Sequence, residues 1–199
     1  MFKLREEWLK EASKMFREEW IKFGVEVPAD AVASAGFPGG GSPRSRIGEC
    51  WPRARSARKV NEIWINPTLD DATQVADVLG HELLHAVDDC KSGHRAAFTA
   101  NSKRVGYSGG KHSQATTDDA KRLISDIVAL CGPYPHGKLD ITKRKQKESS
   151  GLHGCECGCG NKVYVTAAKV AEFGLPSCAN CGEQFHPVGR GTKNTKIYV

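Results

Sequence analysis

The segment His81-Glu82-Leu83-Leu84-His85 constrains this chain more than any other part of its sequence. Residues four positions apart lie on the same face of a helix, so His81 and His85 can bind one metal ion together. Glu82 lies one step round that helix, where its carboxylate can reach a water molecule beside the metal. The segment therefore predicts a helix that carries two metal ligands and a general base.

Apolar residues at helical spacing surround this segment and predict that most of the helix is buried. The alternative is a helix whose two histidines only contact polar neighbours near a core. Burying two imidazoles and a carboxylate without partners is unfavourable, and a metal ion supplies the partner. The expected apolar stripe consists of Val75, Val78, Leu79, Leu83, Leu84 and Val87.

His94 is the best-placed third ligand, because it follows the expected helix end and the preceding Gly93 permits a sharp turn. Three protein ligands with a fourth position open are typical of a catalytic zinc site. A metzincin site is excluded, because Asp88 and Lys91 stand where that class has a glycine and its third histidine. The oxygen ligands that remain as alternatives to His94 are Glu148, Asp118, Asp119 and Asp126.

A second metal site is predicted near the C-terminus, where cysteines stand on both sides of a strand-like segment. Cys178 and Cys181 are separated by two residues and followed by glycine, a spacing typical of tetrahedral zinc sites. Three cysteines compete for the other two places, and Cys157 and Cys159 are favoured over Cys155 because they adjoin a turn. Four thiolates leave no open coordination position, so this zinc is expected to be structural.

Hydrophobic periodicity predicts an α+β chain. An N-terminal helix and a small sheet precede the motif helix, further helices follow it, and a small zinc ribbon ends the chain. The helices are expected at 2–23, 71–90, 94–105 and 117–132, the main strand at 59–66, and loops between short strands at 31–48. The expected domains are a metal-binding catalytic domain at 1–140, a basic linker at 141–150, and the ribbon with its tail at 151–199.

The composition narrows the compartment and the partners. The first twenty residues lack an apolar signal core, and no long hydrophobic run follows, so we expect a cytoplasmic protein without a membrane segment. Eight cysteines in that compartment point to metal binding; Cys50, Cys90 and Cys131 are expected to be ordinary buried thiols.

The net charge of +6 is moderate, but two basic clusters indicate contact with nucleic acid. These clusters are Arg44, Arg46, Arg53, Arg55, Arg58 and Lys59, and Lys143, Arg144, Lys145 and Lys147.

In the order of its motifs the chain resembles the SprT-like family of zinc metallopeptidases, which includes the Spartan proteases, and most closely its short bacterial and phage members. The likeness covers roughly residues 32–187 and rests on IGECW at 47–51, EIWINP at 62–67, HELLHAV at 81–87, GHRAAF at 93–98, GPYPH at 132–136 and the terminal CGCGNKVYV and CANCGEQF. The 85–94 loop is shorter than in the Spartan branch, and Arg95 replaces a glycine common in the family.

The resemblance implies a zincin-like fold and a zinc endopeptidase that cleaves proteins attached to DNA or bound near it. It implies that His81, His85 and His94 bind the catalytic zinc and that Glu82 is the catalytic acid and base. Two zinc ions, one catalytic and one structural, and a monomeric chain are expected.

Several supporting roles are open from the sequence. The strand 62–66 is a candidate for edge pairing with a substrate peptide. The candidates for stabilising the oxyanion are Tyr134, His112 and His136; those for orienting the ligand rings are Asp77, Asp88 and Asp89; and Trp51 and Trp64 are expected in the core. The alternative function is a nucleic-acid-binding or transcription-linked adaptor with a silent peptidase-like domain.

Overall fold

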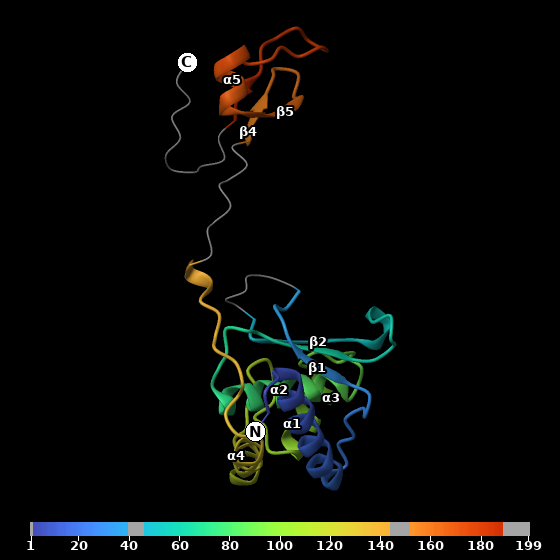
Figure 1. Ribbon diagram of the computed structural model, residues 1–199. Helices are drawn as coiled ribbons and strands as arrows, with labels where there is room; N and C mark the ends of the chain where they lie inside the picture. Colours follow the sequence, from blue (N-terminus) through green and yellow to red (C-terminus); the bar gives the residue numbers. More distant parts are fainter. Residues whose placement is uncertain (1, 40–45, 144–151, 189–199) are drawn as a thin grey trace. The chain divides into compact units, whose positions relative to one another are not determined.

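The computed structural model describes residues 2–39, 46–143 and 152–188 (Figure 1). Among these residues the chain is α+β, with five α-helices and two small sheets of three strands each. It divides into two compact units, Met1–Thr142 and Lys143–Val199. The division falls inside the segment predicted to be a linker. No helix in the described ranges has the length and apolar character needed to cross a bilayer.

The first unit consists of four helices and one sheet. Its elements are α1 (Arg5–Trp20), β1 (Val32–Ala35), β2 (Gly48–Trp51), β3 (Glu62–Ile65), α2 (Ala72–Ala86), α3 (Ala96–Arg104) and α4 (Asp118–Cys131). Short polar side chains start two of these helices. The carboxylate of Asp71 accepts a hydrogen bond from the Gln74 amide at 2.7 Å, and the Thr117 hydroxyl accepts one from the Ala120 amide at 3.3 Å.

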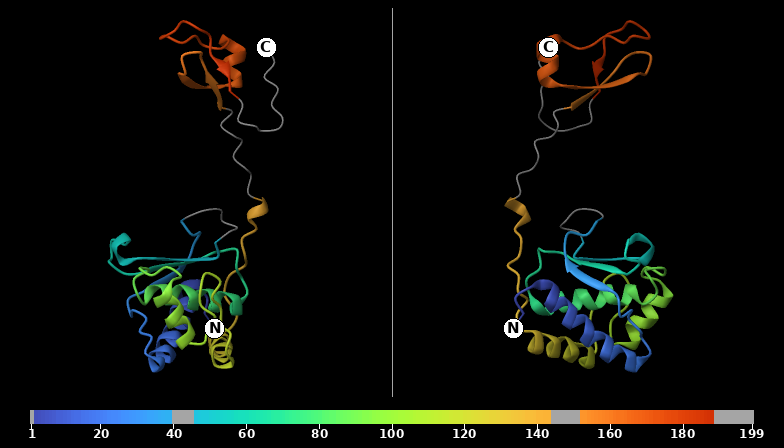
Figure 2. Two further views of the ribbon diagram at one scale, coloured as in Figure 1. Left: turned by 180° about the vertical axis from the view of Figure 1, so that it is seen from behind. Right: turned by 45° about the vertical axis from the view of Figure 1, so that its right-hand side comes forward.

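Strand β3 is the middle strand of the sheet, parallel to β1 and antiparallel to β2. Alternation along β3 buries Ile63 and Ile65 against the helices and leaves Trp64 half-buried on the opposite face. Trp51 of β2 is also half-buried. Both tryptophans were expected in the core, but neither belongs to its buried cluster, so that prediction is wrong. Both further views show the helices gathered on one side of this sheet (Figure 2).

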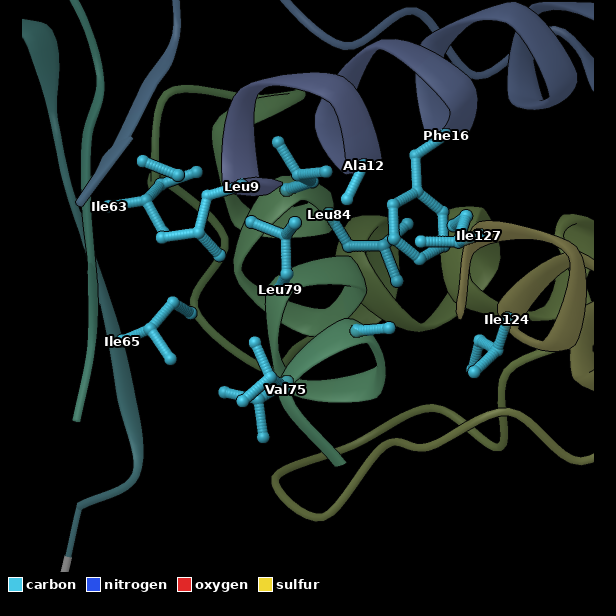
Figure 3. Packing of buried hydrophobic residues seen from close by; sticks show 14 of the residues in the cluster. Leu9, Ala12, Phe16, Ile63, Ile65, Val75, Leu79, Leu84, Ile124 and Ile127 are labelled. Atoms are coloured by element: carbon cyan, nitrogen blue, oxygen red, sulfur yellow. The ribbon is translucent and has the colours of Figure 1, made fainter. Parts of the chain in front are cut away.

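The core of the first unit lies between the sheet and the helices, and Figure 3 shows the part formed by α1, α2 and α4 with the sheet. Helix α1 contributes a row at helical spacing because every third or fourth residue returns to the same face. The buried residues of this row are Trp8, Leu9, Ala12, Phe16 and Trp20. Leu79 and Leu84 of α2 and Ile127 of α4 meet it from the other side. Helix α2 thus has a buried position in a large apolar core.

Helix α2 ends at Ala86, four residues before the predicted end near Cys90. The amide of Cys90 donates to the His85 carbonyl at 2.8 Å, and that of Asp89 donates to the Ala86 carbonyl at 3.1 Å. This pair of bonds is a Schellman motif, which ends a helix through a left-handed residue. Asp89 has that conformation, with φ 59°. Helix α3 begins at Ala96, so the predicted start at His94 is wrong by two residues.

The second unit is small. Its elements are β4 (Leu152–Glu156), β5 (Lys162–Thr166), α5 (Ala167–Phe173) and β6 (His186–Pro187), with antiparallel strands in the order β5-β4-β6. The short helix α5 was not predicted; the Thr166 hydroxyl caps it by accepting from the Lys169 amide at 3.2 Å. Among residues 152–188 the buried cluster consists of Cys155, Cys157, Cys178 and Phe185.

Candidate metal centres

Three imidazoles converge in the first unit. The Nε2 atom of His94 lies 3.2 Å from Nε2 of His81 and 3.1 Å from Nε2 of His85. Two nitrogen ligands of a tetrahedral zinc, each about 2.0–2.1 Å from the metal, stand about 3.3 Å apart. The observed spacing fits that geometry, and the three side chains form a group that could hold a metal ion.

A helix positions two of these rings, and a turn positions the third. His81 and His85 occupy successive turns of α2, as their spacing predicts. His94 lies in the turn before α3, where Gly93 has φ 53°. The carboxylate of Asp88 accepts a hydrogen bond from the Ser92 amide at 3.0 Å, which stabilises the turn that returns His94 to α2.

The surroundings keep the ligand rings neutral and oriented. The Ser113 carbonyl can only accept, so Nδ1 of His81, 3.0 Å away, carries the proton and leaves Nε2 free for a metal. Burial lowers the pKa of all three histidines, and together with its neighbouring imidazoles brings that of His85 to about 3. The ring of Phe98, on α3, stacks on His85 at 4.3 Å and contacts the other two rings.

Glu82 lies beside this group and is 7% exposed. Burial raises its pKa to about 8, the Glu49 charge adds to this, and Arg46 and the Cys50 amide oppose it. Strand β2 passes directly over its carboxylate. A Cβ atom on Gly48 would lie 2.6 Å from Glu82 Oε1, so glycine at this position allows the close approach.

A cleft of about 590 Å³ opens over the three rings and Glu82. Strand β2 forms one wall, and the segment around Ser113 forms another. Of the proposed oxyanion residues only His112 lines this cleft. Tyr134 packs edge-on against Trp8, and His136 contacts Arg5 and the Pro67 carbonyl. The structure therefore places those two in the scaffold.

The three aspartates proposed to orient the ligand rings contact main-chain amides instead. Asp77 accepts from the Ala115 amide at 2.9 Å, next to the segment whose Ser113 carbonyl contacts His81. Asp88 accepts from Ser92 in the turn before His94. Asp89 accepts from the Arg53 amide at 2.7 Å and from the Asn61 side chain at 3.0 Å. These aspartates therefore stabilise backbone segments near the three histidines, and they do not orient the rings directly.

The predicted role of strand 62–66 as a peptide-binding edge is wrong. Strand β3 is hydrogen-bonded to β1 on one side and to β2 on the other, so it has no free edge. Strand β2 is the outer strand on the cleft side, and among the described residues nothing pairs with its other edge. The sequence did not reveal this order, because all three strands are only four residues long.

The second unit brings four thiols together. The Sγ atoms of Cys157, Cys159, Cys178 and Cys181 lie within 4.8 Å of one another, a group that could hold a metal ion. The distance from Cys159 to Cys178 is 3.7 Å, which matches about 3.7 Å between two thiolates of a tetrahedral zinc. Cys155 is outside this group: it is fully buried between β5 and β6.

Hydrogen-bond donors surround the sulfurs of this group. The Asn161 side chain donates to Cys178 Sγ at 3.3 Å, and together with the amides of Asn180 and Cys181 it lowers the Cys178 pKa to about 6. Donors of this kind stabilise a thiolate, the form that binds metal. The CxxCG turn therefore prepares its first cysteine for a cation.

The remaining candidate ligands and cysteines differ in where the structure places them. Asp118, Asp119 and Asp126 are exposed on α4 and outside the histidine group; Glu148 lies outside the described residues, as do Arg44, Arg144, Lys145 and Lys147 of the basic clusters. Cys131 is buried as predicted. Cys50 and Cys90 are not isolated thiols: their Sγ atoms lie 3.3 Å apart, and both residues line the cleft.

No protein-family model, no curated protein and no solved structure matches this chain. We therefore infer the function from the histidine group, the cysteine group and their surroundings. Sequence reasoning missed two parts of the first group, the Ser113 carbonyl and the central position of Phe98. The spacing of Phe98 four residues after His94, on the expected next helix, was the available signal for the latter.

Proposed function

We propose that the first unit is a zinc-dependent endopeptidase domain of zincin type, as the resemblance to SprT-like metallopeptidases implies. One observation carries the proposal: Nε2 of His94 lies 3.2 Å from Nε2 of His81 and 3.1 Å from that of His85, and all three rings line an open cleft together with a buried carboxylate. Three ligands leave a fourth position for solvent or substrate, which distinguishes a catalytic site from a structural one.

The residues of the cleft have separable tasks in this mechanism. The three rings would hold a zinc ion, which would supply the positive charge needed to polarise a water molecule and a peptide carbonyl. Glu82 accepts the proton of the attacking water and passes it to the leaving amine; burial raises the pKa of this carboxyl, which favours its taking up a proton. The Ser113 carbonyl keeps His81 in the tautomer that binds metal through Nε2.

Strand β2 is the element we assign to the substrate backbone. An extended peptide can add to the free edge of a sheet through main-chain hydrogen bonds, which do not depend on side-chain identity. Because β2 passes over Glu82, a peptide paired with it would run alongside the metal site. We therefore expect this peptidase to depend little on the amino-acid sequence of its substrate.

The Glu82→Gln variant tests the catalytic assignment. We expect it to retain both metals and to lose cleavage of casein or histones by at least about a thousandfold, because the proton acceptor is gone. The matched control is Glu62→Gln, the same change at a half-buried carboxylate that bonds Ser56 outside the cleft. Cleavage by Glu82→Gln at the wild-type rate would reject the proposed base.

We further propose that the substrates are proteins bound to DNA, and that the second unit and the basic residues bind nucleic acid. Tyr164 of β5 is 70% exposed beside the Gly154 backbone, and Lys162 is exposed on the same strand, where it lies 3.5 Å from the Glu156 carboxylate. An exposed aromatic ring next to a cation suits base stacking. In the first unit Arg55, Arg58 and Lys59 are exposed, whereas Arg53 pairs with Asp30.

Single-stranded DNA in the cleavage assay separates this proposal from the adaptor alternative. A peptidase acting on DNA-bound proteins cleaves a DNA-bound substrate faster than the free protein, and Tyr164→Ala weakens DNA binding without removing zinc. An adaptor binds DNA with the same dependence on Tyr164 but cleaves nothing at any metal loading.

A further inference from the structure

Two thiols forty residues apart in the sequence meet at the wall of the cleft. Cys50 lies on β2, and Cys90 lies in the turn after α2. Their Sγ atoms are 3.3 Å apart, and the Cys90 Sγ is 3.4 Å from the Cys50 carbonyl. A disulfide bond of about 2.05 Å needs the two sulfurs to approach by only about 1.2 Å.

The backbone around Cys90 maintains this proximity. The Schellman bonds to the His85 and Ala86 carbonyls set the direction of the chain, and Asp89 and Cys90 both have φ 59°. A left-handed conformation is unfavourable for residues other than glycine and persists where surrounding contacts impose it. The Asp89 carboxylate supplies those contacts, because it accepts from the Arg53 amide just beyond β2 and from the Asn61 side chain just before β3.

Neither thiol has a part in the metal sites described above. The histidine group is complete without them, and the four thiols of the second unit form their own group. Both cysteines are half-buried and line a cleft that opens to solvent, so small molecules can reach them. A pair of accessible thiols in contact is the arrangement that exchanges with disulfides.

We propose that Cys50 and Cys90 form a reversible redox pair whose oxidant is a low-molecular-weight disulfide. One thiolate attacks the small disulfide, giving a mixed disulfide and one released thiol. The other thiolate then displaces the second small thiol and forms the Cys50–Cys90 bond. Two protein thiols lose two electrons and two protons in total, and one small disulfide becomes two thiols.

The bond would join the two sides of the catalytic carboxylate. The Cys50 amide acts on Glu82, while Cys90 follows the helix that carries Glu82 and precedes the turn that carries His94. A shift of about 1 Å in a catalytic arrangement can lower the rate about a hundredfold. This part of the proposal rests on the proposed peptidase function. We expect the oxidised protein to cleave its protein substrate at least about tenfold more slowly than the reduced protein, and we expect reduction to restore the rate.

Peptide mapping tests the bond itself and does not depend on peptidase activity. The zinc-loaded full chain is equilibrated with mixtures of reduced and oxidised glutathione, alkylated, and digested with trypsin. We expect peptides 47–53 and 60–91 to appear as one disulfide-linked pair that dithiothreitol separates, while peptide 123–138, which contains Cys131, stays alkylated. Free thiols at both positions in excess oxidised glutathione, or glutathione adducts without the linked pair, would overturn the proposal.

Two further measurements separate the possible failures. Cross-linking of β2 to the turn after α2 should raise the melting temperature of the oxidised chain by at least about 3 °C, an increase absent in Cys50→Ser and Cys90→Ser. If the linked pair forms and both forms cleave at equal rates, control of catalysis is rejected. If the reduced protein cleaves nothing while the pair forms, the peptidase proposal fails and the redox pair stands.

Discussion

The histidine group and the cysteine group differ in what holds their ligands in place. Two of the three histidines stand on a helix buried in a core shared by four helices and a sheet, and the third lies in a turn beside it. The cysteines belong to a unit whose buried cluster has only four residues, two of which are ligands themselves. In the first unit a metal would add chemistry to a core whose apolar packing does not depend on it. In the second unit the metal is expected to replace the core.

His85 and Cys178 reach the protonation states that bind metal by different means. Burial lowers the pKa of His85 to about 3, because a desolvated imidazolium is unfavourable. Hydrogen bonds from Asn161 and two amides lower the pKa of Cys178 to about 6, because they stabilise its thiolate. Desolvation alone would raise the pKa of a thiol, so the cysteine group needs donors and the histidine group needs burial.

The largest effect is expected from Cys178→Ser. If metal replaces the core in the second unit, loss of one thiolate unfolds that unit completely while the first unit keeps its structure. Hydrogen exchange resolved by peptide measures both units in one experiment. The control is Cys155→Ala, which removes a buried sulfur outside the ligand group and should leave the metal bound. Loss of metal in the control would mean that the ligand set is wrong.

A smaller effect on folding and a large effect on metal content are expected from His94→Ala. Removing one of three imidazoles should weaken zinc binding by at least about a hundredfold, yet the metal-free first unit should melt within about 2 °C of the wild type, because His94 is exposed. His112→Ala is the control, since it changes a cleft histidine outside the ligand group. If the first unit of His94→Ala unfolds, the first unit depends on its metal site for folding in the same way as the second.

Gly80→Ala tests how far the first core controls its ligands. A methyl group here would collide with the Tyr107 hydroxyl and displace the segment that leads to Ser113. We expect a destabilisation of about 1–3 kcal/mol and zinc binding weakened several-fold, because His81 loses its carbonyl partner. Thermal melting and competition with a chelator measure the two effects. Gly137→Ala, at an open position, should change neither; tight zinc binding in Gly80→Ala would show that the carbonyl contact is dispensable.

The smallest effect, of opposite sign, is expected from Glu82→Gln on stability. The folded pKa of Glu82 is about 8, above its unfolded value of 4.5, so its contribution to stability is lost as pH rises through that interval. Neutral glutamine avoids burying a charge. The metal-free variant should therefore be more stable than the wild type at pH 8 by about 1–3 kcal/mol, and nearly equal at pH 4. Chemical denaturation at the two pH values measures this, and equal stability at both would contradict it.

Local patterns carried much of the information in this sequence. The four-residue spacing of His81 and His85 and the helix starts at residues 71 and 117 each depend on atoms within one helical turn, so the sequence alone predicted them. The α+β class and the approximate helices follow from hydrophobic periodicity for the same reason. The cysteine spacing likewise indicated a compact four-thiol group before any coordinates.

Contacts between distant segments were decided only by the tertiary structure. The middle position of β3, the Ser113 carbonyl on His81 and the contact of Cys50 with Cys90 join residues 11 or more positions apart, and no local pattern encodes such pairings. The early end of α2 has the same origin. Asp89 adopts a left-handed conformation because its carboxylate bonds Arg53 and Asn61, and those partners are adjacent only after the sheet has packed on the helix.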